Sequence, residues 1–125
     1  MLSPDEFRRI ALKMDGAVES AHMGHPDFRV SGRIFATLLP DGERGMVKLT
    51  PEQQKQCVGK DATTFVPGPG AWGRQGCTCV RLDSADAATV REAMKLAWQN
   101  IAEKRALVRP RSVRSGRTPR LPRKR

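Results

Sequence analysis

Two short stretches of alternating apolar and polar residues, separated by a tight turn, constrain the fold more than any other feature of the sequence. The alternation covers residues 27–31 and resumes over residues 33–39. A period of two residues is typical of a strand with one buried face, because successive side chains point to opposite faces. The residues where the two stretches meet, Ser31-Gly32-Arg33, have the composition of a tight turn. The pattern therefore predicts a β-hairpin.

Three further segments extend this hairpin into a sheet. A second turn at Pro40-Asp41-Gly42 precedes a short apolar segment over residues 46–49, which predicts a strand. An extended segment is expected over residues 62–66, and another strand over residues 76–82. Consecutive strands joined by short links favour an antiparallel meander.

Two helix start signals share one pattern. Ser3 and Thr50 are each followed directly by a proline and, three residues on, by a glutamate or glutamine. This is the arrangement of a capping box with proline in the first helical position. The signals predict helices over residues 4–15 and 51–58.

A longer amphipathic helix is expected to begin at Ser84 or Asp86 and to end near residue 103. Its apolar residues recur at helical spacing and form one stripe. The stripe consists of Val90, Met94, Ala97, Trp98 and Ile101. Helices that bury one face pack on a sheet that buries one face. We therefore predict an α+β fold, a two-layer sandwich in which helices pack on an antiparallel β-sheet.

The chain of 125 residues carries a net charge of +10, and the excess lies entirely in its last 22 residues. Residues 104–125 contain ten basic and no acidic side chains, whereas residues 1–103 contain 13 of each sign. The C-terminal segment also holds three prolines and shows no apolar periodicity, which disfavours a helix. We therefore predict one domain over residues 1–105 and a disordered, arginine-rich tail over residues 106–125.

Four spaced segments of the body resemble the MmcQ/YjbR family of small bacterial proteins. The segments are GHPDFRVSGRIFATL, MVKLTPEQQ, GAWGRQGCTCVRLD and KLAWQNIAEK. The resemblance covers about residues 4–105, and it implies a two-layer fold with helices against an antiparallel sheet. It also implies DNA binding, which is the family's common label and derives from a proposed double-wing arrangement. The family supplies no reaction, ligand or catalytic residue to carry over.

The C-terminal segment is the strongest candidate for nucleic-acid binding. Guanidinium groups bind phosphates with bidentate geometry, and such contacts depend strongly on salt and little on base sequence. The basic residues expected to make these contacts are Arg109, Arg111, Arg114, Arg117, Arg120, Arg123, Lys124 and Arg125. The alternative is a solubilising extension with incidental affinity for polyanions.

In the body, we expect the wing loops to add contacts through Arg33, Lys48 and Arg74. Residues 68–76 form a glycine-rich loop in which Trp72 could stack on a base and Arg74 could bind a phosphate. The loop lacks the Gly-Lys-Ser/Thr ending of a phosphate-binding loop, and a strand rather than a helix follows it. In the alternative interpretation, Trp72 covers an edge of the core and the glycines only allow a bend.

Neither catalysis nor a metal site is predicted. His22, His25 and Asp27 include side chains that zinc binds, but His-x-x-His across a glycine-proline turn is not a recognised ligand spacing. Cys57 and the pair in Cys77-Thr78-Cys79 are expected to act as small apolar residues. No arrangement of nucleophile, base and acid can be argued from the sequence. We expect a protein that is not an enzyme and that uses no cofactor.

Location and partners follow from the same composition. The chain has no apolar run of about eighteen residues that could span a membrane, and its first residues do not form a secretory signal. Three cysteines in such a chain indicate reduced thiols. We expect a cytoplasmic protein that binds nucleic acid, DNA in the first place, through phosphates and that does not bind membranes. The alternative is a protein-interaction module whose sheet or helix face docks a partner chain.

Overall fold

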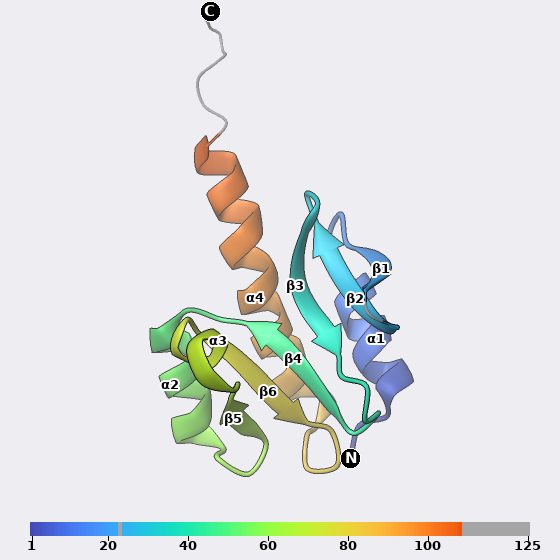
Figure 1. Cartoon of the computed structure of the whole chain (residues 1–125), viewed down its shortest axis with the longest axis vertical. Helices are drawn as coiled ribbons and strands as arrows, with labels where there is room; N and C mark the ends of the chain where they lie inside the picture. The colour runs from blue at the N-terminus through green and yellow to red at the C-terminus, as the bar shows by residue number, and fades with distance from the viewer. Residues whose placement is uncertain (23, 109–125) are drawn as a thin grey trace, which may run out of the picture.

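The computed structural model describes residues 1–22 and 24–108, and within them it shows an α+β fold (Figure 1). Six strands form one antiparallel sheet in the order β1-β2-β3-β4-β6-β5. The strands are β1 (Val18–His22), β2 (His25–Val30), β3 (Arg33–Leu38), β4 (Arg44–Lys48), β5 (Phe65–Pro67) and β6 (Cys77–Arg81). The helices are α1 (Pro4–Leu12), α2 (Pro51–Lys60), α3 (Gly70–Arg74) and α4 (Ala87–Val108). The predicted fold class is confirmed.

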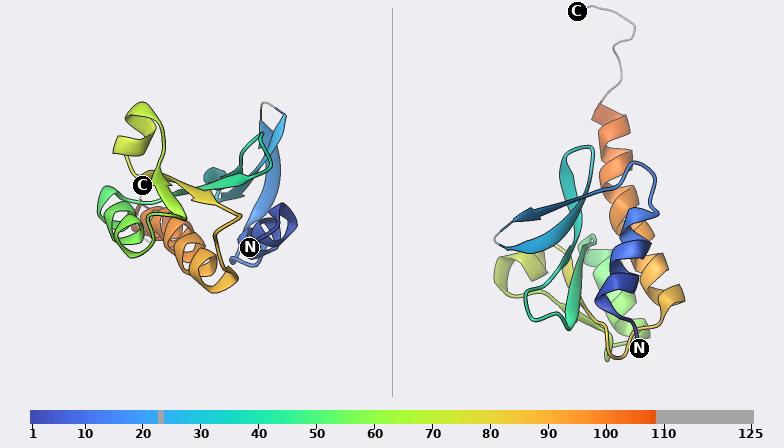
Figure 2. Two further views of the ribbon diagram at one scale, coloured as in Figure 1. Left: turned by 90° about the horizontal axis from the view of Figure 1, so that it is seen from below. Right: turned by 90° about the vertical axis from the view of Figure 1, so that its right-hand side faces the viewer.

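The helices are distributed unequally over the two faces of the sheet. The left view of Figure 2 shows α1, α2 and α4 on one side, and α3 on the other. The connected ends of β1 and β2 also rise on the side of α3. The sheet is therefore concave on the face away from the three longer helices, with α3 and the β1–β2 hairpin at its two rims.

The hydrophobic core lies between the sheet and the longer helices. Its largest fully buried side chains include Phe7, Phe28, Phe35, Phe65 and Met94. α1 approaches the sheet closely at Gly45 of β4, where a Cβ atom would lie 2.5 Å from ring carbons of Phe7. A side chain at Gly45 would therefore push α1 away from the sheet.

The predicted β-hairpin is confirmed as β2 and β3. A two-residue turn, Ser31-Gly32, joins them, and the φ angles of these residues are 55° and 79°. Positive φ at both positions is the geometry of a type I′ turn, whose twist matches that of the flanking strands. The hairpin consequently presents Arg29 and Arg33 close to its turn.

Several element boundaries differ from the prediction. α1 ends at Leu12 rather than at residue 15, and the chain then turns through Gly16, which has a φ of 75°. β1 is not among the predicted strands, because an exposed strand at the edge of the sheet carries no apolar alternation. α4 continues to Val108, beyond the predicted end near residue 103.

The predicted tail of residues 106–125 overlaps this longer helix. Residues 106–108 belong to α4. The rest of the predicted tail, residues 109–125, lies outside the described residues. None of the helices in the described part of the chain is both long and apolar enough to cross a membrane.

Candidate nucleic-acid interface

β3 and β4 separate at one end of the sheet (Figure 1). A hollow of about 550 Å³ lies there, bounded by residues of both strands and of the neighbouring helices. The two strands pair from Leu38 and Gly45 as far as Ala36 and Val47, and beyond that point they diverge. The described residues that line the hollow are Arg29, Gly32, Arg33, Ile34, Lys48, Leu49, Thr50, Pro51, Gln75, Asn100 and Ile101. They come from the β2–β3 hairpin, the end of β4, the start of α2, the end of α3 and α4. The divergence of two strands thus brings three basic side chains to one place.

One of these basic side chains, Arg29, is held by a buried carboxylate. Arg29 Nε donates to Asp27 Oδ1 at 2.8 Å, and Arg29 Nη2 donates to Asp27 Oδ2 at 3.1 Å. Asp27 is fully buried and Arg29 is partly exposed. The hydrogen bond to Asp27 raises the pKa of Arg29, so the guanidinium stays charged. Its remaining N–H groups can donate to an anion, because a guanidinium has five donors and Asp27 occupies only one edge.

The other two basic side chains have no carboxylate partner among the described residues. Arg33 and Lys48 are exposed, and neither forms an ion pair within the part of the chain that the structure describes. Arg33 begins β3 and Lys48 ends β4, so the diverging strands place them on different sides of the hollow. A phosphate bound there would meet positive charge from two elements.

A polar contact between α2 and α4 forms part of the wall. Asn100 Nδ2 donates to the carbonyl oxygen of Lys48 at 3.2 Å and to Gln53 Oε1 at 2.8 Å. Gln53 also completes the capping box of α2 with Thr50. α4 is thereby fixed to the end of β4 and the start of α2. From Asn100, the helix runs eight residues to Val108, about 12 Å at 1.5 Å per residue, and the described part of the chain ends there.

The glycine-rich segment, which the sequence predicts to be a loop, contains the short helix α3 in a fixed position. Gln54 Nε2 donates to the carbonyl oxygens of Gly73 at 3.0 Å and Cys77 at 2.9 Å. A Cβ atom at Gly73 would lie 1.9 Å from the carbonyl oxygen of Gly68, so the two backbones are in contact. Trp72 nevertheless remains 62% exposed. The alternative in which Trp72 covers an edge of the core is therefore wrong.

The structure brings two of the predicted site residues of the body together at the hollow, whereas Trp72 and Arg74 are not among the described residues that line it. Arg33 and Lys48 line the same hollow. Trp72 and Arg74 lie on α3, and Gln75, which follows α3, also lines the hollow. The predicted residues of the tail lie outside the described part of the chain: Arg109, Arg111, Arg114, Arg117, Arg120, Arg123, Lys124 and Arg125.

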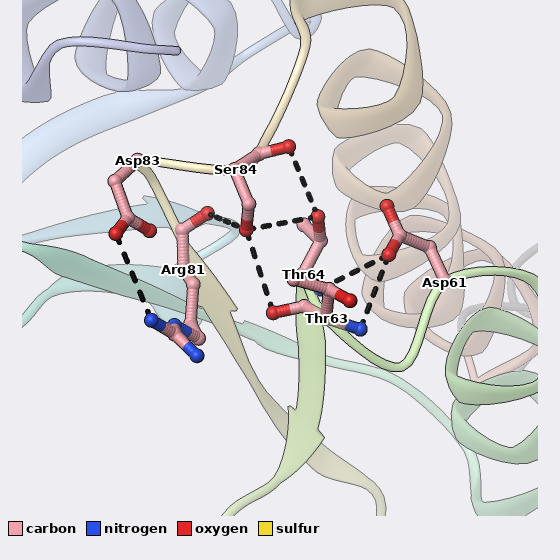
Figure 3. A network of polar contacts seen from close by, with 6 residues as sticks. All are labelled: Asp61, Thr63, Thr64, Arg81, Asp83 and Ser84. Carbon is pink, nitrogen blue, oxygen red and sulfur yellow. Dashed lines mark hydrogen bonds and ion pairs between the residues drawn. The ribbon is translucent and has the colours of Figure 1, made fainter.

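A separate group of polar contacts, near the other end of β6, joins two loops (Figure 3). Asp61 Oδ1 accepts from the backbone N–H of Thr64 at 3.2 Å. Thr64 Oγ1 donates to the carbonyl oxygen of Ser84 at 3.2 Å. These contacts satisfy backbone groups and tie the loop after α2 to the loop before α4. We assign them to stability rather than to binding.

The three thiols have the properties of small apolar side chains. Burial raises the pKa of Cys57, Cys77 and Cys79. For Cys77, the ammonium group of Lys48 opposes this rise in pKa without reversing it. Among the residues that the structure describes, no group of three or more His, Cys, Asp or Glu side chains could hold a metal ion.

We expect the thiols to react slowly in the native chain. Only the thiolate attacks a disulfide reagent, and a raised pKa lowers the thiolate fraction. At pH 8, the native thiols should react more slowly than those of the same chain unfolded in guanidinium chloride. The absorbance of the released aromatic thiolate measures both rates. A native thiol that reacts faster than the unfolded chain would contradict the assignment.

These elements define a small α+β domain whose antiparallel sheet has a cationic hollow at one end. The family model for YjbR matches residues 12–100, and the chain belongs to the YjbR family, which confirms the predicted resemblance. The fold is similar to the crystal structure of Deinococcus radiodurans protein DR2400, family-model domain DUF419. That similarity has a TM-score of 0.67 at 19% sequence identity, and it covers 94% of this chain and 96% of that one. None of the curated proteins matches this chain.

Proposed function

We propose that this protein binds nucleic acid without catalysing a reaction, through phosphate contacts that are largely independent of base sequence. The observation that carries the proposal is the convergence of Arg29, Arg33 and Lys48 on one hollow. α4 leads from that hollow to residues 109–125, whose arginines supply most of the phosphate contacts. DNA is the partner that the family resemblance implies.

The uneven charge of the body supports this proposal. Residues 1–103 contain equal numbers of basic and acidic side chains, so the body as a whole does not attract a polyanion. Among the described residues that line the hollow, three are basic and none is acidic. A positive potential that is confined to one site of an otherwise neutral domain attracts a polyanion to that site and not to the other faces. Such a potential therefore orients the bound polyanion. The basic segment, defined as residues 109–125, then supplies most of the affinity, and the hollow orients the nucleic acid.

A protein-interaction module is the second candidate, and the exposed outer strand β1 favours it. β1 lies at the edge of the sheet, and Val18 within it is 57% exposed. An open edge can accept a strand from a partner chain through backbone hydrogen bonds. Such binding would depend weakly on salt, because the edge offers few charges, whereas phosphate contacts depend on it strongly.

Removing two charges from the hollow tests the first candidate. The double variant Arg33→Gln/Lys48→Gln should bind duplex DNA with a weaker salt dependence. Each lost phosphate contact lowers the slope of log K against log salt concentration by about 0.9, so we expect a reduction of about 1.8. Fluorescence anisotropy of a labelled duplex across a salt series measures this slope with the full chain.

A matched control separates the hollow from net charge. Arg9→Gln/Lys13→Gln removes the same charge from exposed positions at the end of α1, which do not line the hollow. We expect the salt slope of this control to equal that of the unaltered chain. Equal losses in the two double variants would show that only net charge matters. If the unaltered chain binds neither DNA nor RNA at low salt, the protein-interaction module becomes the preferred function.

A further inference from the structure

We infer, resting on the proposed function, that the body selects single-stranded over double-stranded nucleic acid. In this arrangement Trp72 stacks on one base while the cationic hollow holds a neighbouring phosphate. The inference starts from the aromatic residues, which are four phenylalanines and two tryptophans. All four phenylalanines are buried, and Trp98 packs against the core. Trp72 is the aromatic side chain that remains mostly exposed to solvent.

The two tryptophans lie in different environments. Trp98 Nε1 donates to the carbonyl oxygen of Asp15 at 2.8 Å, and its ring packs against the hydrophobic core. Trp72 is 62% exposed and stands outside that core. Tryptophan combines a large apolar surface with one N–H donor, and for this reason it is enriched at binding surfaces. The position of Trp72 therefore fits contact with a ligand better than a role in packing.

Trp72 does not itself line the hollow, but it neighbours a residue that does. Trp72 and Gln75 are three residues apart in the helical turn of α3 and its C-cap. Residues at this spacing are neighbours on one helix face, with Cβ atoms about 5–6 Å apart. Gln75 lines the hollow that also holds Arg33 and Lys48. An aromatic face and a phosphate-binding cluster are thus adjacent on one surface.

The helix that carries Trp72 lies against neighbouring backbone at two glycines that follow the indole. A Cβ atom added at Gly73 would lie 1.9 Å from the carbonyl oxygen of Gly68. A Cβ atom added at Gly76 would lie 1.9 Å from the carbonyl oxygen of Leu49. These approaches hold α3 against neighbouring backbone. A pre-positioned ring loses little conformational freedom when a base stacks on it.

Stacking gives the selectivity for a single strand. In a duplex, neighbouring base pairs cover the faces of each base, whereas a single strand can place an unstacked base on an aromatic side chain. Phosphates occur in both, so Arg33 and Lys48 do not distinguish them. Trp72 therefore adds affinity for a single strand that a duplex does not receive.

The test compares Trp72→Ala and Trp72→Phe in the full chain with two labelled probes. The probes are oligothymidylate of about 16 nucleotides and a duplex of the same length, matched to the larger sites of single-strand binding domains. By anisotropy, Trp72→Ala should weaken oligothymidylate binding about five- to one-hundred-fold, the value of one stacked base. Duplex binding should stay unchanged, and Trp72→Phe should recover part of the loss. In a Trp98→Phe chain, oligothymidylate should quench the fluorescence of the remaining Trp72.

Each outcome distinguishes this inference from the proposed function. Circular dichroism first establishes that the exposed position tolerates both substitutions without loss of fold. If both probes bind and Trp72→Ala changes neither affinity, or changes both equally, the inference is wrong and the proposed function stands. If oligothymidylate binds but leaves Trp72 fluorescence unchanged, stacking is wrong. If the unaltered chain binds neither probe at low salt, both proposals are wrong.

Discussion

A chain that ends at Val108 is expected to lose most of its affinity for DNA and most of the salt dependence of that affinity. Truncation removes eight basic side chains, all between residues 109 and 125. If each contacts a phosphate of duplex DNA, the salt slope falls by up to about 7, and affinity at about 50 mM salt falls by roughly a thousand-fold or more. Anisotropy titrations of both chains across a salt series measure the two quantities.

The residual binding of the truncated chain is as informative as the loss. Arg29, Arg33 and Lys48 remain, so a slope of up to about 2.7 should persist on a duplex. A full chain in which the eight basic residues are replaced by glutamine is the matched control, because it keeps the length and removes only the charge. It should behave like the truncated chain. Full affinity in the chain that ends at Val108 would refute a dominant role for the basic segment.

The parts of the fold that the sequence predicts are those encoded by neighbouring residues. The capping boxes at Ser3 and Thr50 form as expected, because each needs only four consecutive residues. The Ser31-Gly32 turn is equally local, since its two positive φ angles belong to consecutive residues. The register shift between Phe28 and Arg29 in the same hairpin has no such local signal. α3 is different, because its conformation depends on Gln54, which donates to Gly73 from another helix. Composition alone favours a loop there.

The candidate site is less predictable because distant segments assemble it. The sequence indicates Arg33 and Lys48 separately as residues of wing loops, but the hollow between them exists only because β3 and β4 diverge. Arg29 is not among the predicted site residues. The sequence feature that could have indicated Arg29 is Asp27, an acidic residue two positions earlier. A strand places residues at this spacing on the same face of the sheet. Asn100 carries no local signal, because its partners belong to β4 and α2.

Gly76→Ala is expected to lower the free energy of unfolding by at least about 3 kcal/mol, since it combines backbone strain with a steric clash. Gly76 has a φ of 111°, which L side chains rarely adopt, and a Cβ atom there would lie 1.9 Å from the carbonyl oxygen of Leu49. The clash also opposes the hydrogen bond from the backbone N–H of Leu49 to the carbonyl oxygen of Gly76, 3.3 Å long. Thermal unfolding followed by circular dichroism should show a Tm lower by about 10 °C or more.

Gly59→Ala is the matched control, with the opposite expected sign. Gly59 lies in α2 with nothing within 4 Å of its Cβ position, so alanine there should raise stability by up to about 1 kcal/mol. The comparison separates the effect of the site from that of an added methyl group. Gly76 also holds α3 against the backbone at Leu49, beside the hollow. Gly76→Ala should therefore weaken oligothymidylate binding even at temperatures where the chain remains folded. An unchanged Tm would show that the backbone at Leu49 yields, and that α3 is not fixed beside the hollow as the proposed stacking by Trp72 requires.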